Sequence, residues 1–522
     1  MSSNSLNAQQ NTIVTQPTSK KIGFFSTILL VIGSSIGAGI FLKNGEVLGN
    51  VQGSFILSIV SWIIAIVAII CMGLTLAEIC SANTQNDQGI IGWVKTFNNK
   101  FLYKGAKNFM AYIYLPLNFF VMPYYAIMTI QDAFGWSLDW YYVMLICLAI
   151  VIWFVVMSGL SSRMGNIQNW IITSVKFLPL AFAAVIGFVL IGTGNVTSGT
   201  TPGLMPDPSW PDGVVDSTPL FQQLSPVLGV FCSIPAIFFA FDGFYATAGI
   251  QSQMKEPKKV SMAMAVGLAV VSFIDILISV SLLLCSTNGK IDGIEWLNAN
   301  PWLLQTINFL IAIGILGIIN GFAIYTPIFY EDLVRKGEIP FCTKYEDKLN
   351  HDRPKVGVSI SLIITIPIII IFTLIGAYGY IDINNYSFSS HYASTMHTAT
   401  LYSFVDLMAN WTSVLAFACI VAATIGCLKN RKTKKVKVEK SKVFVPCAWV
   451  SIVIVGISLL FIVVATIANI GLVSYYFANN MYADRIEGGK NLLGVCLTFV
   501  VLILFLAIMF TEPIVQKIKK TY

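Results

Sequence analysis

The sequence is short of charge and of histidine. Only 11% of its 522 residues are Asp, Glu, Lys or Arg, and three are His, whereas soluble domains carry roughly 25% charged residues. The histidines fall in expected loops, and no HExxH, CxxC or other metal-ligand spacing occurs. These absences argue against a metal site, a disulfide framework and an intramembrane enzyme, so we expect no catalytic residue, no metal and no cofactor.

Apolar residues dominate instead, at 56% of the chain. They come in runs of roughly 20, the length that crosses about 30 Å of hydrocarbon at about 1.5 Å per residue. We therefore predict an all-α integral membrane protein with about twelve transmembrane helices. The expected spans are 24–42, 54–79, 106–131, 140–158, 167–192, 226–250, 262–285, 303–333, 356–376, 400–428, 444–468 and 491–512.

The net charge of +7 is distributed unevenly. Twelve spans place both termini on one side, and nearly all Lys and Arg residues share that side. The residues expected in or next to the opposite loops are Lys43, Lys290, Arg485 and Lys490. By the positive-inside rule the side of the termini is cytoplasmic. We expect a multi-pass protein of the cell membrane with both termini in the cytoplasm, and no nucleic-acid partner.

Three segments define the predicted domain organisation. Residues 1–21, rich in Ser, Asn, Gln and Thr, predict a disordered cytoplasmic tail. Residues 22–515 form a single transmembrane domain, and 516–522 a cytoplasmic C-terminus. The basic run 429–442 follows a span and is interpreted as a topology anchor, with recognition of anionic lipid as the alternative.

Two spans carry helix-breaking residues near their middle. The first reads ILLVIGSSIGAGIFL and contains Gly33, Gly37 and Gly39. The sixth places Asp242 and Gly243 after Pro235. Glycine costs about 1 kcal/mol relative to alanine in a helix, and a mid-membrane aspartate requires a partner or a cavity. The two breaks lie five spans apart, which suggests two five-helix halves of opposite orientation. The alternative is that the glycines only permit close helix packing.

Four motifs in order resemble the amino acid–polyamine–organocation (APC) superfamily of permeases. They are GSSIGAGIF (33–41), LAEICSANTQNDQGIIGWV (76–94), FFAFDGFYATAGIQSQMKEPKK (238–259) and INGFAIYTPIFYEDLVRKGEIP (319–340). The resemblance implies a leucine-transporter-like five-plus-five inverted repeat with helices 1 and 6 broken, plus two extra C-terminal helices. It also implies secondary active transport of amino acids by alternating access.

Carried over residue by residue, the resemblance implies a substrate site built mostly from backbone. The substrate carboxylate would meet N–H groups near Ala38 and Gly39, and the amine would meet carbonyls near Ser35, Phe239 and Asp242. Phe239 and Phe241 would close over the substrate. The implied substrate-binding residues are Ser35, Ile36, Gly37, Ala38, Gly39, Phe239, Ala240, Phe241, Asp242, Gly243 and Phe322.

Lys176 lies in the fifth span and is similar to a helix 5 lysine of sodium-independent family members, whose ammonium replaces a bound cation. Burial disfavours the charged form of a lysine, so this group can release and take up a proton. We expect it to couple transport to protons or to support sodium-independent exchange, with its ammonium near a carbonyl of 33–36 or near 323–326 of helix 8. The alternative is a snorkelling lysine without function.

A second function stays open at this point, transport of a polyamine or other organic cation, for which Asp242 would supply negative charge. Asp275, also inside a span, is interpreted as a hydrogen-bonding group between helices. The expected partners are a small-molecule amino acid and membrane lipid. The identity of the amino acid and the oligomeric state do not follow from the sequence.

Overall fold

The computed structural model describes residues 23–35, 37, 39–82, 89–196, 203–207, 219–246, 259–339, 342–350, 353–380, 396–482 and 485–519. Within these ranges the chain is helical and contains no strand. Ten of the described helices are long and apolar enough to cross a membrane, and the two expected broken spans are present as shorter pieces. The predicted tail, 1–21, lies outside the described residues.

The helices follow the predicted order of spans. Their bounds are α1 (Phe24–Ser35), α2 (Gly39–Asn50), α3 (Phe55–Cys80), α4 (Ile90–Phe97), α5 (Lys100–Phe109), η1 (Met110–Tyr114), α6 (Leu115–Phe134), α7 (Trp140–Leu160), α8 (Ser162–Gly192), α9 (Leu220–Gln223), α10 (Pro226–Cys232), α11 (Ile234–Ala240), η2 (Phe244–Ala246), α12 (Val260–Cys285), α13 (Glu295–Asn298), α14 (Pro301–Arg335), η5 (Thr343–Lys348), α15 (Lys355–Leu374), η6 (Ile375–Gly379), α16 (Met396–Thr433), α17 (Phe444–Ala478) and α18 (Arg485–Lys519). Counting α1 with α2, α5 with α6, and α10 with α11 as single spans, and leaving out the short helices α4, α9 and α13, gives the predicted twelve.

Several spans run past their predicted ends. In two of them, polar side chains that interrupt the apolar pattern have partners inside the protein. The first was expected to end at residue 42, but α2 continues to Asn50 with Lys43 and Asn44 fully buried. Likewise α17 continues beyond 468, and the Asn469 side chain accepts a hydrogen bond from Phe221 N at 2.9 Å. Hydropathy falls at such residues although the helix does not stop.

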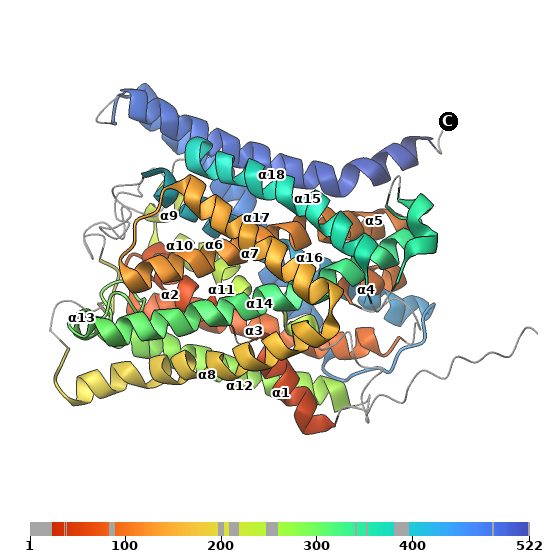
Figure 1. Ribbon diagram of the computed structural model, residues 1–522, viewed down its shortest axis with the longest axis horizontal. Helices are drawn as coiled ribbons and strands as arrows, with labels where there is room; N and C mark the ends of the chain where they lie inside the picture. Colours follow the sequence, from red (N-terminus) through yellow and green to blue (C-terminus); the bar gives the residue numbers. More distant parts are fainter. Residues whose placement is uncertain are drawn as a thin grey trace, which may run out of the picture.

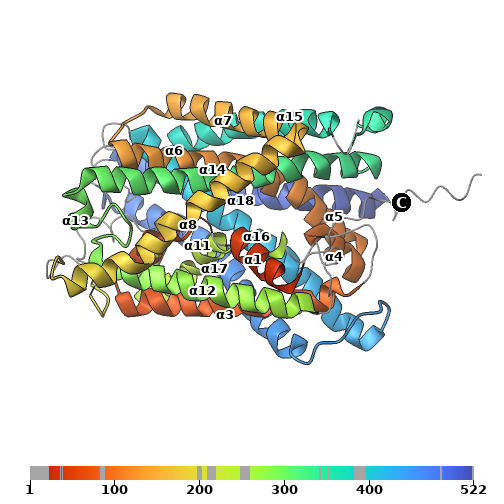
Figure 2. The ribbon, with the colours of Figure 1, turned by 60° about the horizontal axis from the view of Figure 1, so that its bottom comes forward.

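The pieces α2 and α11 of the two broken spans are buried inside the bundle, whereas α1 lies at its lower edge in Figure 1. Helix α1 packs on α12. Helices α2 and α11 pack on each other, and α11 also packs on α3 and α16. Figure 2 shows α1, α11 and α16 near the middle, with α7 and α15 along one edge and α3 along the other. Helix α18 packs on α5 and α17 and forms the upper edge in Figure 1.

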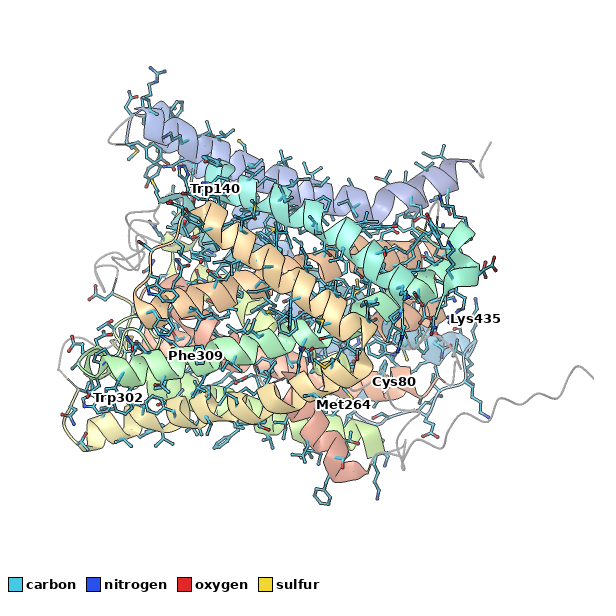
Figure 3. All side chains as sticks on the ribbon, viewed as in Figure 1. Cys80, Trp140, Met264, Trp302, Phe309 and Lys435 are labelled. Atoms are coloured by element: carbon cyan, nitrogen blue, oxygen red, sulfur yellow. The ribbon has the colours of Figure 1, made fainter. Side chains whose placement is uncertain are left out.

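The two ends of the bundle differ in character. In Figures 1 and 2, α13 lies at one end, and α4, α5 and the C-terminus lie at the other. Figure 3 places Trp302 at the α13 end and Lys435 at the opposite end. Tryptophan is enriched at membrane interfaces, and lysine is enriched on the cytoplasmic side.

Candidate functional site

The break in the first span lies where the glycines predict it. Helix α1 ends at Ser35, the chain bends at Gly37, and α2 begins at Gly39. Two predicted site residues, Ile36 and Ala38, lie outside the described residues. The first N–H groups of a helix have no partner within the helix, so the start of α2 presents donors at this break.

The sixth span is interrupted in a similar way. Helix α11 ends at Ala240, and the chain turns through 241–243 into the short helix η2. Gly243 has φ of 104°, a conformation that residues with a Cβ rarely adopt. The Asp242 N–H donates to Phe239 O at 3.1 Å, which closes the turn.

The two breaks touch. A Cβ placed on Gly39 would lie 2.6 Å from the Cα of Ala240 and 3.2 Å from its Cβ. The structure therefore has the predicted pair of interrupted helices side by side. It also gives Gly39 a role that the sequence did not suggest, because packing against α11 alone excludes any side chain at this position.

Lys176 lies against the end of α1. Its Nζ donates to the carbonyl oxygen of Gly33 at 2.5 Å. Gly33 lies in 33–36, one of the two stretches predicted to lie near this ammonium. Lys176 in α8 also lies beside Gly314 of α14, since a Cβ added to Gly314 would be 3.3 Å from the Lys176 Cβ. The stretch 323–326 of α14 lies at another level, since Ile324 packs against Gly165 at the start of α8.

A cluster of charged side chains lies one turn along α2 from Gly39. The fully buried Lys43 ammonium contacts Asp406 Oδ1 of α16 at 2.7 Å and Glu46 Oε2 at 2.8 Å. Tyr125 of α6 donates to Asp406 Oδ1 at 2.5 Å, and Asn410 donates to Glu46 Oε1 at 2.6 Å. The expectation that Lys43 lies in or next to an outside loop was wrong, because two carboxylates compensate its charge inside the protein.

This Lys43 cluster borders the break at the end of α11 through aromatic rings. The Lys43 Nζ lies 5.4 Å from the ring centroid of Phe239 and 5.5 Å from that of Tyr125. The two rings themselves are 5.7 Å apart. Cation–aromatic contacts of this length are attractive, so α2, α6, α11 and α16 meet beside the breaks.

A second cluster surrounds the Asp242 carboxylate. Tyr114 donates to Oδ2 at 2.9 Å, Tyr245 donates to Oδ1 at 3.0 Å, and Ser413 of α16 donates to Oδ2 at 3.4 Å. Tyr114 is the last residue of η1, a π-helical turn, and such turns are frequent at functional sites. Three hydroxyl groups thus donate to the Asp242 carboxylate, and no ion pair joins it to a cation among the described residues.

The three predicted aromatic residues differ in their surroundings. Phe239 faces Tyr125, as described above. The Phe241 ring is fully buried with its centroid 6.5 Å from that of Trp62 in α3. Phe322 of α14 packs edge-on against Tyr114 at 6.0 Å and Phe119 at 6.4 Å.

Sequence reasoning missed most of the side chains that surround the breaks. Asp406 lies within the predicted tenth span, so an intramembrane carboxylate was visible and its basic partner was worth seeking. Tyr114, Tyr245 and Ser413 carry no such signal, since tyrosine and serine are common in spans. Ser35 Oγ is buried and has no hydrogen-bond partner among the described residues. No metal-binding group of His, Cys, Asp and Glu occurs within the described ranges.

Comparisons with known proteins agree with this architecture. A family model described as amino acid permease matches residues 22–502. A Mycoplasma pneumoniae protein designated only "Uncharacterized protein" is 39% identical, with 95% of this chain and 94% of that protein covered. The serine/threonine exchanger SteT of Bacillus subtilis is 24% identical, with 64% of this chain and 72% of that protein covered.

A solved structure shares the fold. The crystal structure of MhsT in complex with L-phenylalanine superimposes with a TM-score of 0.51 at 14% identity, over 84% of this chain and 98% of that chain. At this identity the likeness concerns the fold alone. The family model covers almost all of the membrane-spanning part. The chain is a multi-pass membrane transporter that belongs to the amino acid permease family of the APC superfamily.

Proposed function

We propose that this permease is a secondary active transporter of α-amino acids that works without sodium, either with protons or as an exchanger. The observation that carries the proposal is the contact between the two breaks, with the Lys176 ammonium 2.5 Å from the Gly33 carbonyl. Unwound backbone is tolerated in a membrane only where it is buried in protein or lines a cavity. Alternating access around this point would carry the substrate across.

The backbone polarity at the breaks suits a zwitterion. The start of α2 at Gly39 offers unpaired N–H groups and the positive end of a helix dipole, which favour a carboxylate. The ends of α1 at Ser35 and of α11 at Ala240 offer carbonyls and the negative ends of dipoles, which favour an ammonium group. The unpartnered Ser35 hydroxyl adds one polar group that a substrate can satisfy.

Lys176 supports independence from sodium. Its ammonium already neutralises the carbonyl end of α1, a position that favours a cation. Loss of its proton would remove the charge and one donor, and hydrogen bonds to charged groups contribute roughly 1.5–3 kcal/mol. That is about one to two factors of ten in a conformational equilibrium, enough to bias outward against inward states.

Amino acids are favoured over the alternative substrate class, polyamines and other organic cations. Asp242 could attract a polycation, but three hydroxyl groups already donate to its carboxylate. The names of the two similar proteins also point to amino acids, since SteT is a serine/threonine exchanger and MhsT was crystallised with L-phenylalanine. For the orientation, we propose the cell membrane with the lysine-rich end in the cytoplasm.

The test is uptake of a panel of labelled amino acids by purified protein in liposomes, with sodium and the pH gradient varied separately. We expect saturable uptake of at least one amino acid without sodium, stimulated by a pH gradient or by amino acid inside the liposomes. An excess of putrescine should not compete. Competition by putrescine without uptake of any amino acid would favour the polyamine carrier, and an absolute requirement for sodium would remove the role proposed for Lys176.

A further inference from the structure

The last turn of α16 and the loop that joins it to α17 carry the densest positive charge of the sequence. Within 429–442, named here the lysine loop, Glu439 is the acidic residue. Seven lysines are exposed, namely Lys429, Lys432, Lys434, Lys435, Lys437, Lys440 and Lys442. None of the seven forms an ion pair with any described residue. Their mutual repulsion is therefore uncompensated within the described protein.

The lysine loop is nevertheless held in one course. The fully buried Glu78 side chain near the end of α3 accepts from Arg431 Nε at 2.8 Å and Nη2 at 2.5 Å, and from Ser441 N at 2.8 Å. Arg431 also donates to Ser441 O at 2.6 Å, which joins the two ends of the loop. Bidentate arginine–carboxylate pairs are among the strongest charge-assisted hydrogen bonds.

Further contacts secure the middle of the lysine loop. The Asn430 side chain exchanges two hydrogen bonds of 2.8 Å with the backbone of Val436, and Glu439 N donates to Ser81 Oγ at 2.8 Å. These bonds use backbone groups and leave the lysine side chains free to point outward. Figure 3 shows Lys435 at the same end of the molecule as Cys80, the last residue of α3.

The position of the lysine loop in the chain keeps it close to the membrane surface. Only residues 434–443 separate the spans α16 and α17, so the loop stays at the membrane surface. The start of α17 exposes Val443, Val445 and Trp449, at 45%, 37% and 58%. Exposed apolar side chains at the start of a span face acyl chains, and tryptophan favours the headgroup level. Lysines and a lipid-facing apolar surface are thus adjacent.

We propose that the lysine loop binds the phosphate headgroups of anionic phospholipids, with an acyl chain against the exposed start of α17. Basic clusters directly beside a span recognise such lipids through charge. A bound headgroup would offset the repulsion among the lysines. It would also stabilise the junction between α3 and α16, because Glu78 and Arg431 join these helices beneath the loop.

The test compares lipids on the full-length protein in a neutral detergent. Thermal unfolding is followed while phosphatidylglycerol or phosphatidylcholine is added, and the midpoint shifts give apparent affinities. One variant carries Lys435→Gln, Lys437→Gln and Lys440→Gln, and a second carries arginine at these three positions. The matched control carries Lys344→Gln, Lys348→Gln and Lys355→Gln. These exposed residues lie in η5, between α14 and α15, and at the first position of α15, on the same side of the bundle.

We expect phosphatidylglycerol, but not phosphatidylcholine, to raise the unfolding temperature, and added salt to weaken the effect. Each lysine near an anionic surface accounts for about a factor of five in affinity, so the triple glutamine variant should bind roughly a hundredfold more weakly. The arginine and control variants should resemble the wild type. Wild-type affinity in the glutamine variant would overturn the proposal, as would equal stabilisation by inorganic phosphate or by a short oligonucleotide.

Discussion

Gly39 and Gly33 belong to the same interrupted span but have different surroundings. A Cβ on Gly39 would lie 2.6 Å from Ala240 Cα, whereas a Cβ on Gly33 would meet nothing within 4 Å. We expect Gly39→Ala to push α2 away from α11, to lower the unfolding free energy by about 1–3 kcal/mol and to abolish transport. Gly33→Ala should unfold and transport like the wild type. Normal uptake by Gly39→Ala would show that the two breaks need not touch.

Lys176 can be tested by removing its charge or making it permanent. We expect Lys176→Ala to insert but not to transport, because the Gly33 carbonyl loses its cationic partner. Lys176→Arg stays charged at every accessible pH, so it should bind substrate without completing the cycle. Binding and uptake are measured separately in proteoliposomes between about pH 5 and 8, with Lys344→Ala as control. Wild-type rates and pH dependence in Lys176→Ala would contradict the coupling role.

In the Lys43 cluster, we expect removal of the two acids to cost more stability than removal of the lysine. Lys43 is fully buried, whereas the Glu46 and Asp406 side chains are 27% and 36% exposed. Removal of both acids leaves a buried cation without a partner, which costs about 3–5 kcal/mol. Lys43→Met leaves two carboxylates that water can reach. In thermal unfolding we expect the Glu46→Gln, Asp406→Asn double variant to be much less stable than Lys43→Met, and the reverse order would refute this account.

At the scale of elements, the Glu78–Arg431 pair joins α3 to the end of α16 and holds the lysine loop. We expect Glu78→Gln to release the loop, since the Arg431 guanidinium and the Ser441 backbone amide both lose a charged acceptor. Trypsin should then cleave within 434–442 several times faster, and the Ser441 amide should exchange its hydrogen sooner. Asp332→Asn provides the control, because its pair with Arg335 is about half exposed and contributes about 0–1 kcal/mol.

The helices themselves were largely predictable from the sequence. Hydrophobic runs located all twelve spans, because a membrane requires roughly 20 apolar residues and a backbone that satisfies itself. The ends of α2 and α17 were not predictable, since Lys43 and Asn469 have partners that lie far away in the sequence. The π-helical turn at 110–114 left no mark in the apolar pattern either, because MAYIY suits an ordinary helix.

At the scale of the whole molecule, the last helix is attached away from the breaks. Glu512 of α18 contacts Lys104 Nζ at 2.7 Å and Lys107 Nζ at 3.2 Å, both on α5. Its side chain is 37% exposed, so the pairs contribute modestly, about 1 kcal/mol. We expect Glu512→Gln to lower the unfolding temperature by a few degrees with unchanged substrate affinity. A large loss of affinity would mean that α18 takes part in the transport cycle.

The family motifs predicted the backbone of the candidate site but not its side chains. Glycines and the aspartate mark the breaks because only a few residue types permit them, so these positions are visible in one sequence. Apart from one local pair in each, the Asp242 and Lys43 clusters join residues that are 128 to 364 positions apart. Such pairings depend on how the twelve helices pack, and an apolar pattern does not encode which faces meet.

The distance along the chain between Lys43 and Asp406 also has a consequence for biosynthesis. The two residues are 363 positions apart. At roughly 5–20 residues per second, a ribosome needs about 20–70 s to reach the aspartate after the lysine. During that interval Glu46, one helical turn from Lys43, is the neighbouring counter-ion that is already present. Glu46 therefore neutralises Lys43 while the first span enters the membrane, before Asp406 has been synthesised.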